Sequence, residues 1–208
     1  MSHAPHVTST ALGEVASTEG TARQGFTLWL TGLSGAGKST LAGAIAARLR
    51  AESTPVEVLD GDEVREHLSK GLTFSREDRD INVRRIAYVA KLLSRNGVGV
   101  ITAAISPYRG TRDQVRREIG DRFVEVYVNA SLEACIERDP KGLYRQALAG
   151  TIASFTGVSD PYEAPLSPEL ELSTERESIV ESVDRVIETL RRLGFLPRAR
   201  HSTMAYPA

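Results

Sequence analysis

The chain has 208 residues, of which 41% are hydrophobic and 25% are charged, and its formal net charge is −1. This length suits one compact domain with a sizeable core. The near-neutral charge excludes a general electrostatic attraction to nucleic acids or membranes. Any phosphate binding must therefore come from a local site.

The cysteine content and the N-terminal segment bear on the compartment. Cys135 is the single cysteine, which excludes an intrachain disulfide and argues against a cysteine-based zinc site. The N-terminal segment has no basic region followed by an apolar run, so it does not resemble a signal peptide. No stretch approaches the roughly 18 apolar residues that a membrane span needs. We therefore expect a cytoplasmic protein.

Apolar runs and segments with helical spacing alternate along the chain. We predict strands at 26–31, 56–59, 98–105, 123–128 and 170–172, and helices at 39–50, 63–69, 78–96, 113–119 and 132–138. A last helix is predicted to be capped by Thr174 and Glu177, to end at Gly194, and to carry on its inner face Ile179, Val183, Val186, Leu190 and Leu193. This alternation predicts an α/β fold of three layers, with a mostly parallel sheet covered on both faces by helices.

The segments outside this alternation define the domain organisation. Residues 1–24 and 197–208 lack periodicity and are predicted to be flexible arms around one domain at 25–196. The segment at about 139–168 is rich in proline and glycine and is long for a plain connection. Such segments in compact domains are often lids, and we interpret this one in that way.

A phosphate-binding loop follows the first predicted strand. The sequence GLSGAGKST matches the pattern G-x-x-x-x-G-K-[ST], and a helix follows it directly. Glycines allow a backbone path that turns several N–H groups toward an anion, and the helix N-terminus adds partial positive charge. The motif predicts binding of a nucleoside triphosphate but does not separate kinases from GTPases or ATPases. Its residues are Gly32, Leu33, Ser34, Gly35, Ala36, Gly37, Lys38, Ser39 and Thr40.

Lys38, Ser39 and Asp62 have the side chains for phosphoryl transfer. Lys38 would reach the β- and γ-phosphates, and the Ser39 hydroxyl would bind Mg²⁺. Asp62 follows the second predicted strand, beside the phosphate site, where it would polarise an attacking hydroxyl or hold Mg²⁺ through water. Asp62 would also suit an N-cap of the following helix. Asp60 is the weaker candidate of the two carboxylates.

Three further segments are candidates for the acceptor side. Arg79 and Asn82 share one stripe of a predicted helix with Ile86, where an anion would also feel the helix dipole; a solvated basic face remains the alternative. Ser106 follows the third strand and would contact substrate or carry phosphate transiently. No base is paired with it, so we do not expect a covalent intermediate. Arg138 and Lys141 open the lid and would close over the phosphates.

Six motifs in this order resemble those of adenylyl-sulfate kinases, also called APS kinases. They are GLSGAGKST, LDGD, FSREDRDINVRR, ISPYR, RDPKGLY and FTGVSDPYEAP, and the resemblance runs from about Trp29 to Leu172. It implies a P-loop NTPase-type fold and transfer of the γ-phosphate of ATP to the 3′-hydroxyl of adenylyl sulfate. The product would be 3′-phosphoadenylyl sulfate. Mg²⁺ would be the cofactor, and a homodimer, with or without a separate sulfurylase partner, is implied.

The resemblance also implies roles by position. Gly32–Thr40 and Arg138 would bind ATP, Ser39 and Asp62 would hold the metal, and Lys38, Asp62 and Ser106 would be catalytic. Ser106 matches a serine described in this family as a phosphoserine intermediate. The implied set that binds adenylyl sulfate consists of Asp62, Arg65, Phe74, Arg79, Asn82, Ile105, Ser106, Lys141 and Phe155.

The sequence leaves two other hypotheses about function open. One is a P-loop kinase for another metabolite, such as gluconate, shikimate or a nucleoside. The other is a regulator that binds nucleotide or adenylyl sulfate without turnover, although the intact Lys38, Ser39 and Asp62 argue against it.

Overall fold

The sheet is formed by five parallel strands in the order β2-β3-β1-β4-β5. The structure, a computed structural model, describes residues 24–198, so most of the two predicted arms lies outside the described residues. The strands are β1 (Thr27–Thr31), β2 (Val56–Asp60), β3 (Gly99–Ala103), β4 (Phe123–Asn129) and β5 (Leu170–Ser173). Because all are parallel, their carboxyl ends meet at one edge, as the sequence predicted.

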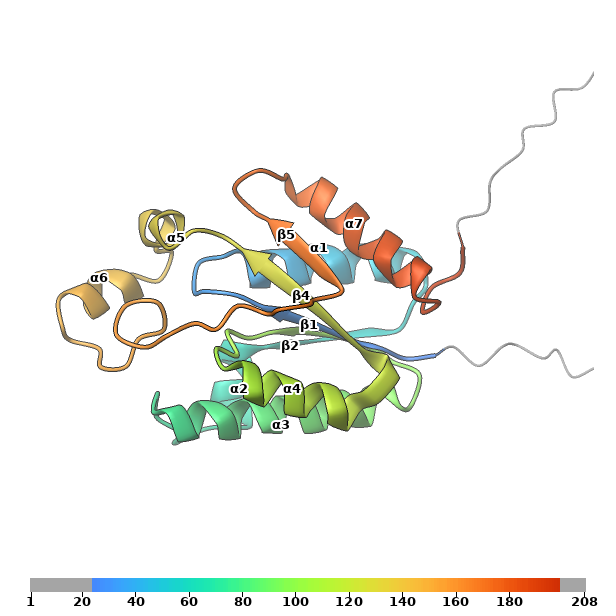
Figure 1. Cartoon of the computed structure of the whole chain (residues 1–208). Coiled ribbons are helices and arrows are strands. Elements are labelled where there is room, and N and C mark those ends of the chain that lie inside the picture. The colour runs from blue at the N-terminus through green and yellow to red at the C-terminus, as the bar shows by residue number, and fades with distance from the viewer. Residues whose placement is uncertain (1–23, 199–208) are drawn as a thin grey trace, which may run out of the picture.

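Helices cover both faces of this sheet, which confirms the predicted three-layer α/β fold. Helices α1 and α7 lie on one face, and α3 and α4 lie on the other (Figure 1). The helices are α1 (Lys38–Ala51), α2 (Gly61–His67), α3 (Arg76–Ser94), α4 (Arg109–Ile119), α5 (Leu132–Arg138), α6 (Leu143–Leu148) and α7 (Ile179–Arg192), with a 3-10 turn at Gly120–Arg122. No helix among residues 24–198 is long and apolar enough to cross a membrane.

The sheet divides the core into two apolar clusters. The cluster on the α1 and α7 side includes Leu28 and Ile45, both fully buried. The cluster on the α3 and α4 side contains Trp29, Ile86 and Val115. Adjacent residues of β1 thus serve opposite clusters, because side chains alternate across a strand.

Two predicted helix starts differ from the structure by more than two residues. Helix α7 begins after Ser178, whose hydroxyl accepts from the Glu181 N–H while Glu181 accepts from the Ser178 N–H, so the predicted cap at Thr174 and Glu177 is wrong. Ile179 is therefore in the exposed first turn, at 50% exposure, instead of on the inner face. Leu193 follows the helix and is also exposed, while the central apolar positions are buried as predicted.

Helix α4 is the second difference. It begins at Arg109, four residues before the predicted start at residue 113, because the chain turns directly from the Ser106-Pro107 bend into the helix. Helix α3 is capped by Ser75, whose hydroxyl accepts from the Asp78 N–H at 3.2 Å.

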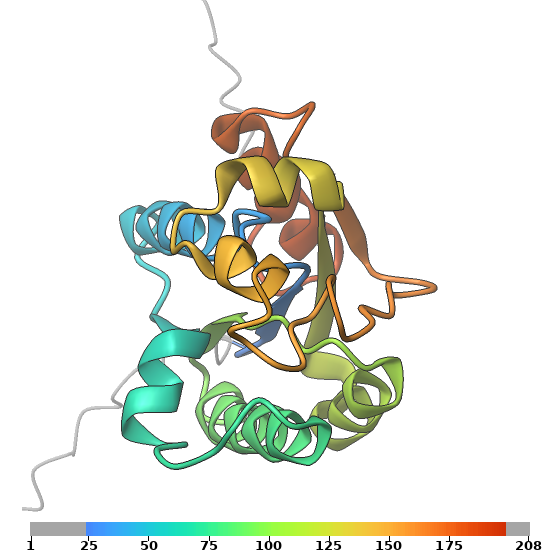
Figure 2. The ribbon, with the colours of Figure 1, turned by 90° about the vertical axis from the view of Figure 1, so that its left-hand side faces the viewer.

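The predicted lid segment contains α6 and then returns as an irregular chain toward β5. In Figure 2, α6 and this return segment lie in front of the end of the sheet at which the strands finish. Helix α6 and the return segment therefore cover the edge of the sheet at which the glycine loop begins.

Candidate active site

A cavity of about 580 Å³ opens at the carboxyl edge of the sheet. It brings together the glycine loop, the end of β2, the first turns of α3, the bend after β3 and the lid. The predicted site residues that line it are Ser34, Gly35, Gly37, Lys38, Ser39, Thr40, Asp62, Arg65, Phe74, Arg79, Asn82, Ile105, Ser106, Arg138, Lys141 and Phe155. Gly32, Leu33 and Ala36 complete the loop behind this surface.

The glycine loop has a backbone path that only glycine adopts without strain. Gly35 and Gly37 have φ angles of 74° and 100°, in the left-handed region. A Cβ atom on Gly35 would also lie 3.2 Å from the carbonyl oxygen of Cys135. The loop leads into the N-terminus of α1 at Lys38, where free N–H groups and the helix dipole favour an anion.

Lys38 lies inside this loop, with only 8% of its surface exposed. Its ammonium group donates to the carbonyl oxygens of Gly32 at 2.9 Å and Leu33 at 2.6 Å. Burial lowers the pKa of Lys38 from 10.5 to about 8, so the side chain remains mostly protonated at neutral pH. The loop thus holds one cation at the position where phosphate charge would be bound.

Oxygen donors suited to a magnesium ion lie beside the loop. The Ser39 hydroxyl donates to Asp60 Oδ2 at 2.6 Å. Among residues 24–198 no three His, Cys, Asp or Glu side chains gather as a metal site. Magnesium bound with nucleotides takes one or two protein oxygens and completes its shell with phosphates and water, so this sparse set fits it.

Asp60, rather than Asp62, is the carboxylate that reaches Ser39. Asp60 also caps α2 by accepting from the Asp62 N–H at 3.0 Å, so Asp62 is not the N-cap. The Asp62 side chain is 70% exposed and forms an ion pair with Lys141 of the lid. Sequence reasoning ranked Asp62 above Asp60, and only the direct contact with Ser39 distinguishes them.

Arg79 joins the α3 side of the cavity to the predicted lid segment. It is 6% exposed, and its guanidinium donates to the carbonyl oxygens of Phe74 and Ser154 and to the Thr156 hydroxyl. Asp160 lies 3.9 Å from the same group. The guanidinium therefore anchors the return segment of the lid at the cavity.

Asn82 lies one turn further along α3 and is also buried. Its Oδ1 atom has no hydrogen-bond partner among the described residues. Since buried polar atoms are nearly always paired, an unpaired acceptor in a cavity wall fits a ligand that donates to it.

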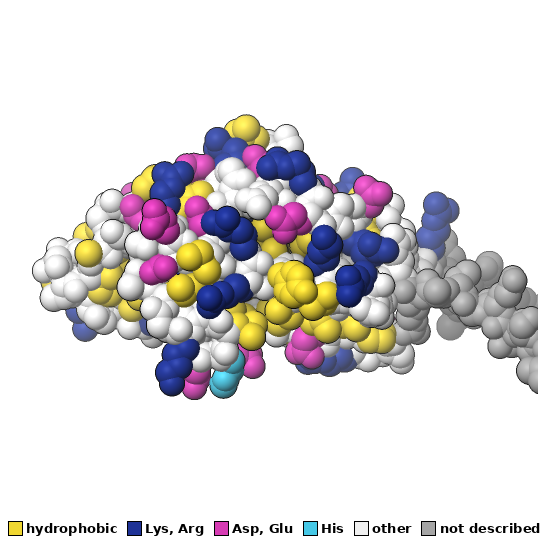
Figure 3. Space-filling view, turned by 90° about the horizontal axis from the view of Figure 1, so that it is seen from below, with side chains coloured by type: hydrophobic (Ala, Val, Ile, Leu, Met, Phe, Trp, Pro, Cys, Tyr) yellow, Lys and Arg dark blue, Asp and Glu magenta, His cyan; other side chains and the backbone are white. Residues whose placement is uncertain are grey.

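On the outer side of α3, Arg84 and Arg85 are exposed and lie with Ile81 and Tyr88 around a separate shallow groove. Figure 3 shows hydrophobic and basic side chains mixed on the underside of the molecule.

Two aromatic side chains lie at the cavity. Phe74 is 52% exposed, and the Arg65 guanidinium lies 4.4 Å from its ring centroid. Phe155 belongs to the lid, is 7% exposed and contacts the ring of Tyr144 edge-on at 5.0 Å. Both rings line the cavity, where a flat aromatic ligand would find apolar surface.

Ser106 is held in an uncommon backbone conformation. Its φ angle is 39°, which costs a residue other than glycine roughly 1–3 kcal/mol. Its hydroxyl accepts from the indole N–H of Trp29 at 3.0 Å and lies 3.4 Å from the carbonyl oxygen of Ala104. The residue lines the cavity but is only 2% exposed, so its hydroxyl is engaged with the protein.

Arg138 of the predicted set contacts the glycine loop, and so do two residues outside that set, Thr174 and Tyr144. Arg138 donates to the carbonyl oxygens of Gly35 and Thr174, at 3.4 and 3.0 Å. Thr174 itself donates to the Ala36 carbonyl oxygen at 3.0 Å, and Tyr144 donates to that of Ser34, also at 3.0 Å. No local pattern identifies Thr174 or Tyr144 in this role, because their partners are distant in sequence.

The glycine loop at the start of α1, its buried lysine and the cavity beside them define a P-loop nucleotide-binding protein. Residues 24–173 match the family described as adenylylsulphate kinase. The adenylyl-sulfate kinase of Myxococcus xanthus is 60% identical over 178 residues, which cover 84% of this chain and 96% of that protein. The chain therefore belongs to the adenylyl-sulfate kinase family and is an ATP-dependent phosphotransferase.

Two further comparisons agree with this membership. A Sorangium cellulosum protein named a probable bifunctional SAT/APS kinase is 58% identical over 174 residues, covering 84% of this chain and 30% of that protein. The Mycobacterium tuberculosis APS kinase in complex with AMPPNP and APS has a TM-score of 0.77 and 42% identity, covering 81% of this chain and 98% of that one. These results confirm the predicted family and fold, and they argue against a kinase for an unrelated metabolite.

Proposed function

We propose that this chain transfers the γ-phosphate of MgATP to the 3′-hydroxyl of adenylyl sulfate within the cavity at the carboxyl edge of the sheet. The observation that carries the proposal is the shared cavity, which is lined by the glycine loop on one side and by Asp62, Arg79, Asn82 and Phe155 on the other. One cavity thus has the chemistry for a triphosphate and for an anionic nucleotide acceptor.

The glycine loop and its neighbours hold ATP in this proposal. Main-chain N–H groups at the start of α1 bind the β- and γ-phosphates. Lys38 exchanges its two carbonyl partners for phosphate oxygens and neutralises charge that develops during transfer. Arg138 lies against the loop and guards the phosphates from water.

Ser39 and Asp60 are the proposed neighbours of the magnesium ion, with Asp62 reaching it through water. When bound, Mg²⁺ would neutralise negative charge on the β- and γ-phosphate oxygens. Asp60, the weaker of the two carboxylate candidates in the sequence, joins the proposed metal set because its carboxylate lies 2.6 Å from the Ser39 hydroxyl.

Asp62 receives the proton of the attacking hydroxyl. The O3′ atom forms a bond to the γ-phosphorus, the bond from that phosphorus to the β,γ-bridging oxygen breaks, and ADP leaves with its electron pair. Asp62 is ion-paired with Lys141 in this structure. When the substrate anions enter, Lys141 exchanges this partner for them, which frees the Asp62 carboxylate. The proton on Asp62 then passes to solvent, because the side chain is exposed.

The α3 side of the cavity holds adenylyl sulfate. Arg79 and Arg65 face its anionic groups, Asn82 accepts a hydrogen bond from it, and the rings of Phe74 and Phe155 contact its adenine. Ile105 and Ser106 form the wall behind the ribose in this proposal. Ser106 acts there as part of the wall rather than as a phosphate carrier, since Trp29 and Ala104 engage its hydroxyl.

A product assay tests the proposed reaction. The protein is incubated with MgATP and adenylyl sulfate, gluconate, shikimate or a nucleoside, and the phosphorylated product is identified by mass. Of the acceptors tested with MgATP, we expect only adenylyl sulfate to be phosphorylated. The Lys38→Ala variant should turn over at least about 10²-fold more slowly, because it lacks the charge that counts most in the transition state. Tight binding of both ligands without product would instead identify a regulator without turnover, and product with another acceptor would reject the assignment.

Three wider features belong to the same proposal. The family resemblance supports a homodimer, which light scattering would test against the monomer mass of 22.6 kDa. A separate sulfurylase partner is proposed because a relative's name joins SAT and APS kinase in one protein. A cytoplasmic location is proposed from the single, buried, free thiol of Cys135.

A further inference from the structure

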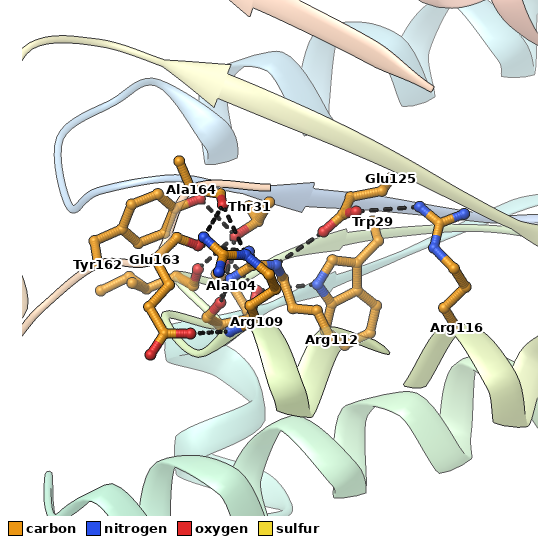
Figure 4. Close-up of polar contacts among 12 residues, drawn as sticks. Trp29, Thr31, Ala104, Arg109, Arg112, Arg116, Glu125, Tyr162, Glu163 and Ala164 are labelled. Carbon is orange, nitrogen blue, oxygen red and sulfur yellow. Dashed lines mark hydrogen bonds and ion pairs between the residues drawn. The ribbon is translucent and has the colours of Figure 1, made fainter. Parts of the chain in front are cut away.

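The buried cation Arg112 lies outside the cavity and has no role in the proposed reaction so far. It is 1% exposed, on the inner side of α4, and its three guanidinium nitrogens point to three different segments (Figure 4). Nε donates to Glu125 of β4 at 2.8 Å. The other two nitrogens donate to main-chain carbonyl oxygens, those of Ser106 at 2.7 Å and Glu163 at 2.6 Å.

The first of these carbonyls belongs to the strained bend that lines the cavity. Ser106 has a left-handed backbone at φ 39°, and such a conformation persists only when its surroundings hold it. Thr31 donates to the neighbouring Ile105 carbonyl oxygen at 2.7 Å, and Trp29 donates to the Ser106 hydroxyl. Arg112 adds the one charged donor among these contacts, and charge-assisted hydrogen bonds are roughly twice as strong as neutral ones.

The second carbonyl belongs to the end of the lid. Glu163 also donates its N–H to the Pro107 carbonyl oxygen at 2.9 Å and accepts from the Arg109 N–H at 2.8 Å. Arg109 donates in addition to the Ala164 carbonyl oxygen at 3.0 Å. The end of the lid is therefore bonded to the bend after β3, and Arg112 bridges the two from beneath.

We infer that Arg112 is a positioning residue for the phosphate acceptor: it fixes the Ile105–Pro107 bend in its left-handed form and joins it to the Glu163 end of the lid. The inference rests on the proposed function, in which this bend is the wall behind the acceptor. Arg112 contacts no reacting atom. It acts through the carbonyl groups of Ser106 and Glu163, and it requires the forked geometry that only a guanidinium has.

Arg116 provides a matched control, because it belongs to the same ionic network without touching the bend. It lies one turn further along α4 and pairs with Glu125 at 3.1 Å and with Glu169 at 2.5 Å. If the network only stabilised the fold, neither Arg112→Lys nor Arg116→Lys would change the KM for adenylyl sulfate below its unfolding temperature, although the buried Arg112 would lose more stability than the 34% exposed Arg116. Both variants keep a positive charge next to Glu125, so both are expected to fold, whereas Arg112→Gln would leave that carboxylate buried without its closest partner.

The decisive experiment compares steady-state kinetics of the wild type, Arg112→Lys and Arg116→Lys, each assayed well below its unfolding temperature. We expect Arg112→Lys to raise the KM for adenylyl sulfate about tenfold or more, while the KM for ATP stays within about twofold. Arg116→Lys should keep both values near those of the wild type. The emission of Trp29, the single tryptophan, should change in Arg112→Lys, because its indole N–H is bonded to Ser106.

Three results would overturn the inference. They are a wild-type KM for adenylyl sulfate with unchanged Trp29 emission in Arg112→Lys, a parallel rise of both KM values, and an equal effect of Arg116→Lys. A wild type that forms no product from adenylyl sulfate would instead reject the proposed function. The two failures are therefore distinguishable within one set of assays.

Discussion

At the scale of single residues, burial decides what the charged side chains near the cavity do. Lys38 and Arg112 are both almost fully buried cations, yet only Arg112 is paired directly with a carboxylate, that of Glu125. The ammonium of Lys38 rests on two carbonyl oxygens, and desolvation is the main cause of its lowered pKa. Lys38 thus carries a charge that a phosphate would stabilise, whereas Arg112 carries one that the protein has already neutralised.

Lys38 should make ATP use dependent on pH. In the free enzyme its pKa is lowered to about 8 by burial, so the positive charge is lost as pH rises through that value. We expect kcat/KM for ATP, which reports the free enzyme, to be level below about pH 7.5 and to fall above about pH 8. Initial rates with both substrates well below their KM values measure this profile, because most of the enzyme is then free. Lys38→Arg is the control, since arginine stays protonated and its profile should lack the fall.

The same shift fixes the sign of the effect of Lys38 on stability. Between about pH 8 and the ordinary value of 10.5, the unfolded chain binds the proton that the folded chain has released. The contribution of Lys38 to the free energy of unfolding therefore rises with pH across this window.

The kinetic profile tests the same pKa. A kcat/KM for ATP that stays level to about pH 9.5 in the wild type would contradict a pKa of about 8 for Lys38.

At the scale of elements, α3 joins the wall of the cavity to the predicted lid segment. Its inner stripe places Arg79 and Asn82 in the cavity wall and Ile86 in the core, as the helical spacing predicted. The contacts of Arg79 with Ser154 and Thr156 add a function that the stripe does not reveal, since they attach the lid to the helix.

Arg79→Ala should weaken adenylyl sulfate binding more than ATP binding. A hydrogen bond to a charged group contributes about 1.5–3 kcal/mol, so we expect the KM for adenylyl sulfate to rise roughly 10- to 100-fold. The KM for ATP should stay within about twofold, since Arg79 does not contact the glycine loop. Arg84→Ala on the exposed side of the same helix is the control. A larger loss for ATP than for adenylyl sulfate would refute the placement of this helix at the acceptor.

The capping box of α7 should be measurable as stability. Ser178→Ala removes the hydroxyl that accepts from the Glu181 N–H, and we expect a loss of about 1 kcal/mol. For a chain of this size this corresponds to a decrease in Tm of about 2–4 °C in thermal unfolding. Glu188→Ala, on the exposed face of α7, should change Tm little. Equal Tm values for Ser178→Ala and the wild type would show that the cap does not stabilise the helix.

At the scale of the whole molecule, the strand order creates the site. Strand β1 lies between β3 and β4, and β2 lies beyond β3, so the chain after β1, β2 and β3 leaves the sheet at one edge. The glycine loop, the Asp60–Asp62 turn and the Ser106 bend are these three exits. Parallel strands with helical crossovers bring them together although they are far apart in sequence.

The central strand should dominate stability. Leu28 of β1 is fully buried in the cluster on the α1 and α7 side, so Leu28→Ala should lower the free energy of unfolding by about 2–5 kcal/mol. Urea unfolding measures the difference, with Leu166→Ala as the control because Leu166 is 77% exposed. The control should change the free energy by no more than about 0.5 kcal/mol. Similar values for the two variants would place Leu28 outside the cooperative core.

Local patterns explain which predictions succeeded. The glycine loop and the buried stripe of α3 depend on neighbours within a few residues, and the sequence displays those directly. The cap of α7 was missed because Ser178 with Glu181 and Thr174 with Glu177 have the same spacing. The Thr174 hydroxyl instead donates to the carbonyl oxygen of Ala36, which lies 138 positions earlier in the sequence.

The sequence by itself therefore determined the class of the protein: the alternation of strands and helices, the triphosphate loop, and the motifs of its kinase family. Only the tertiary structure decided that Asp60 meets Ser39, that Arg79 holds the lid, and that Arg112 supports the Ser106 bend. The physical reason is the separation in sequence between the interacting residues. Helix, strand and loop preferences arise between near neighbours, whereas these polar contacts exist only after the sheet has brought distant segments together.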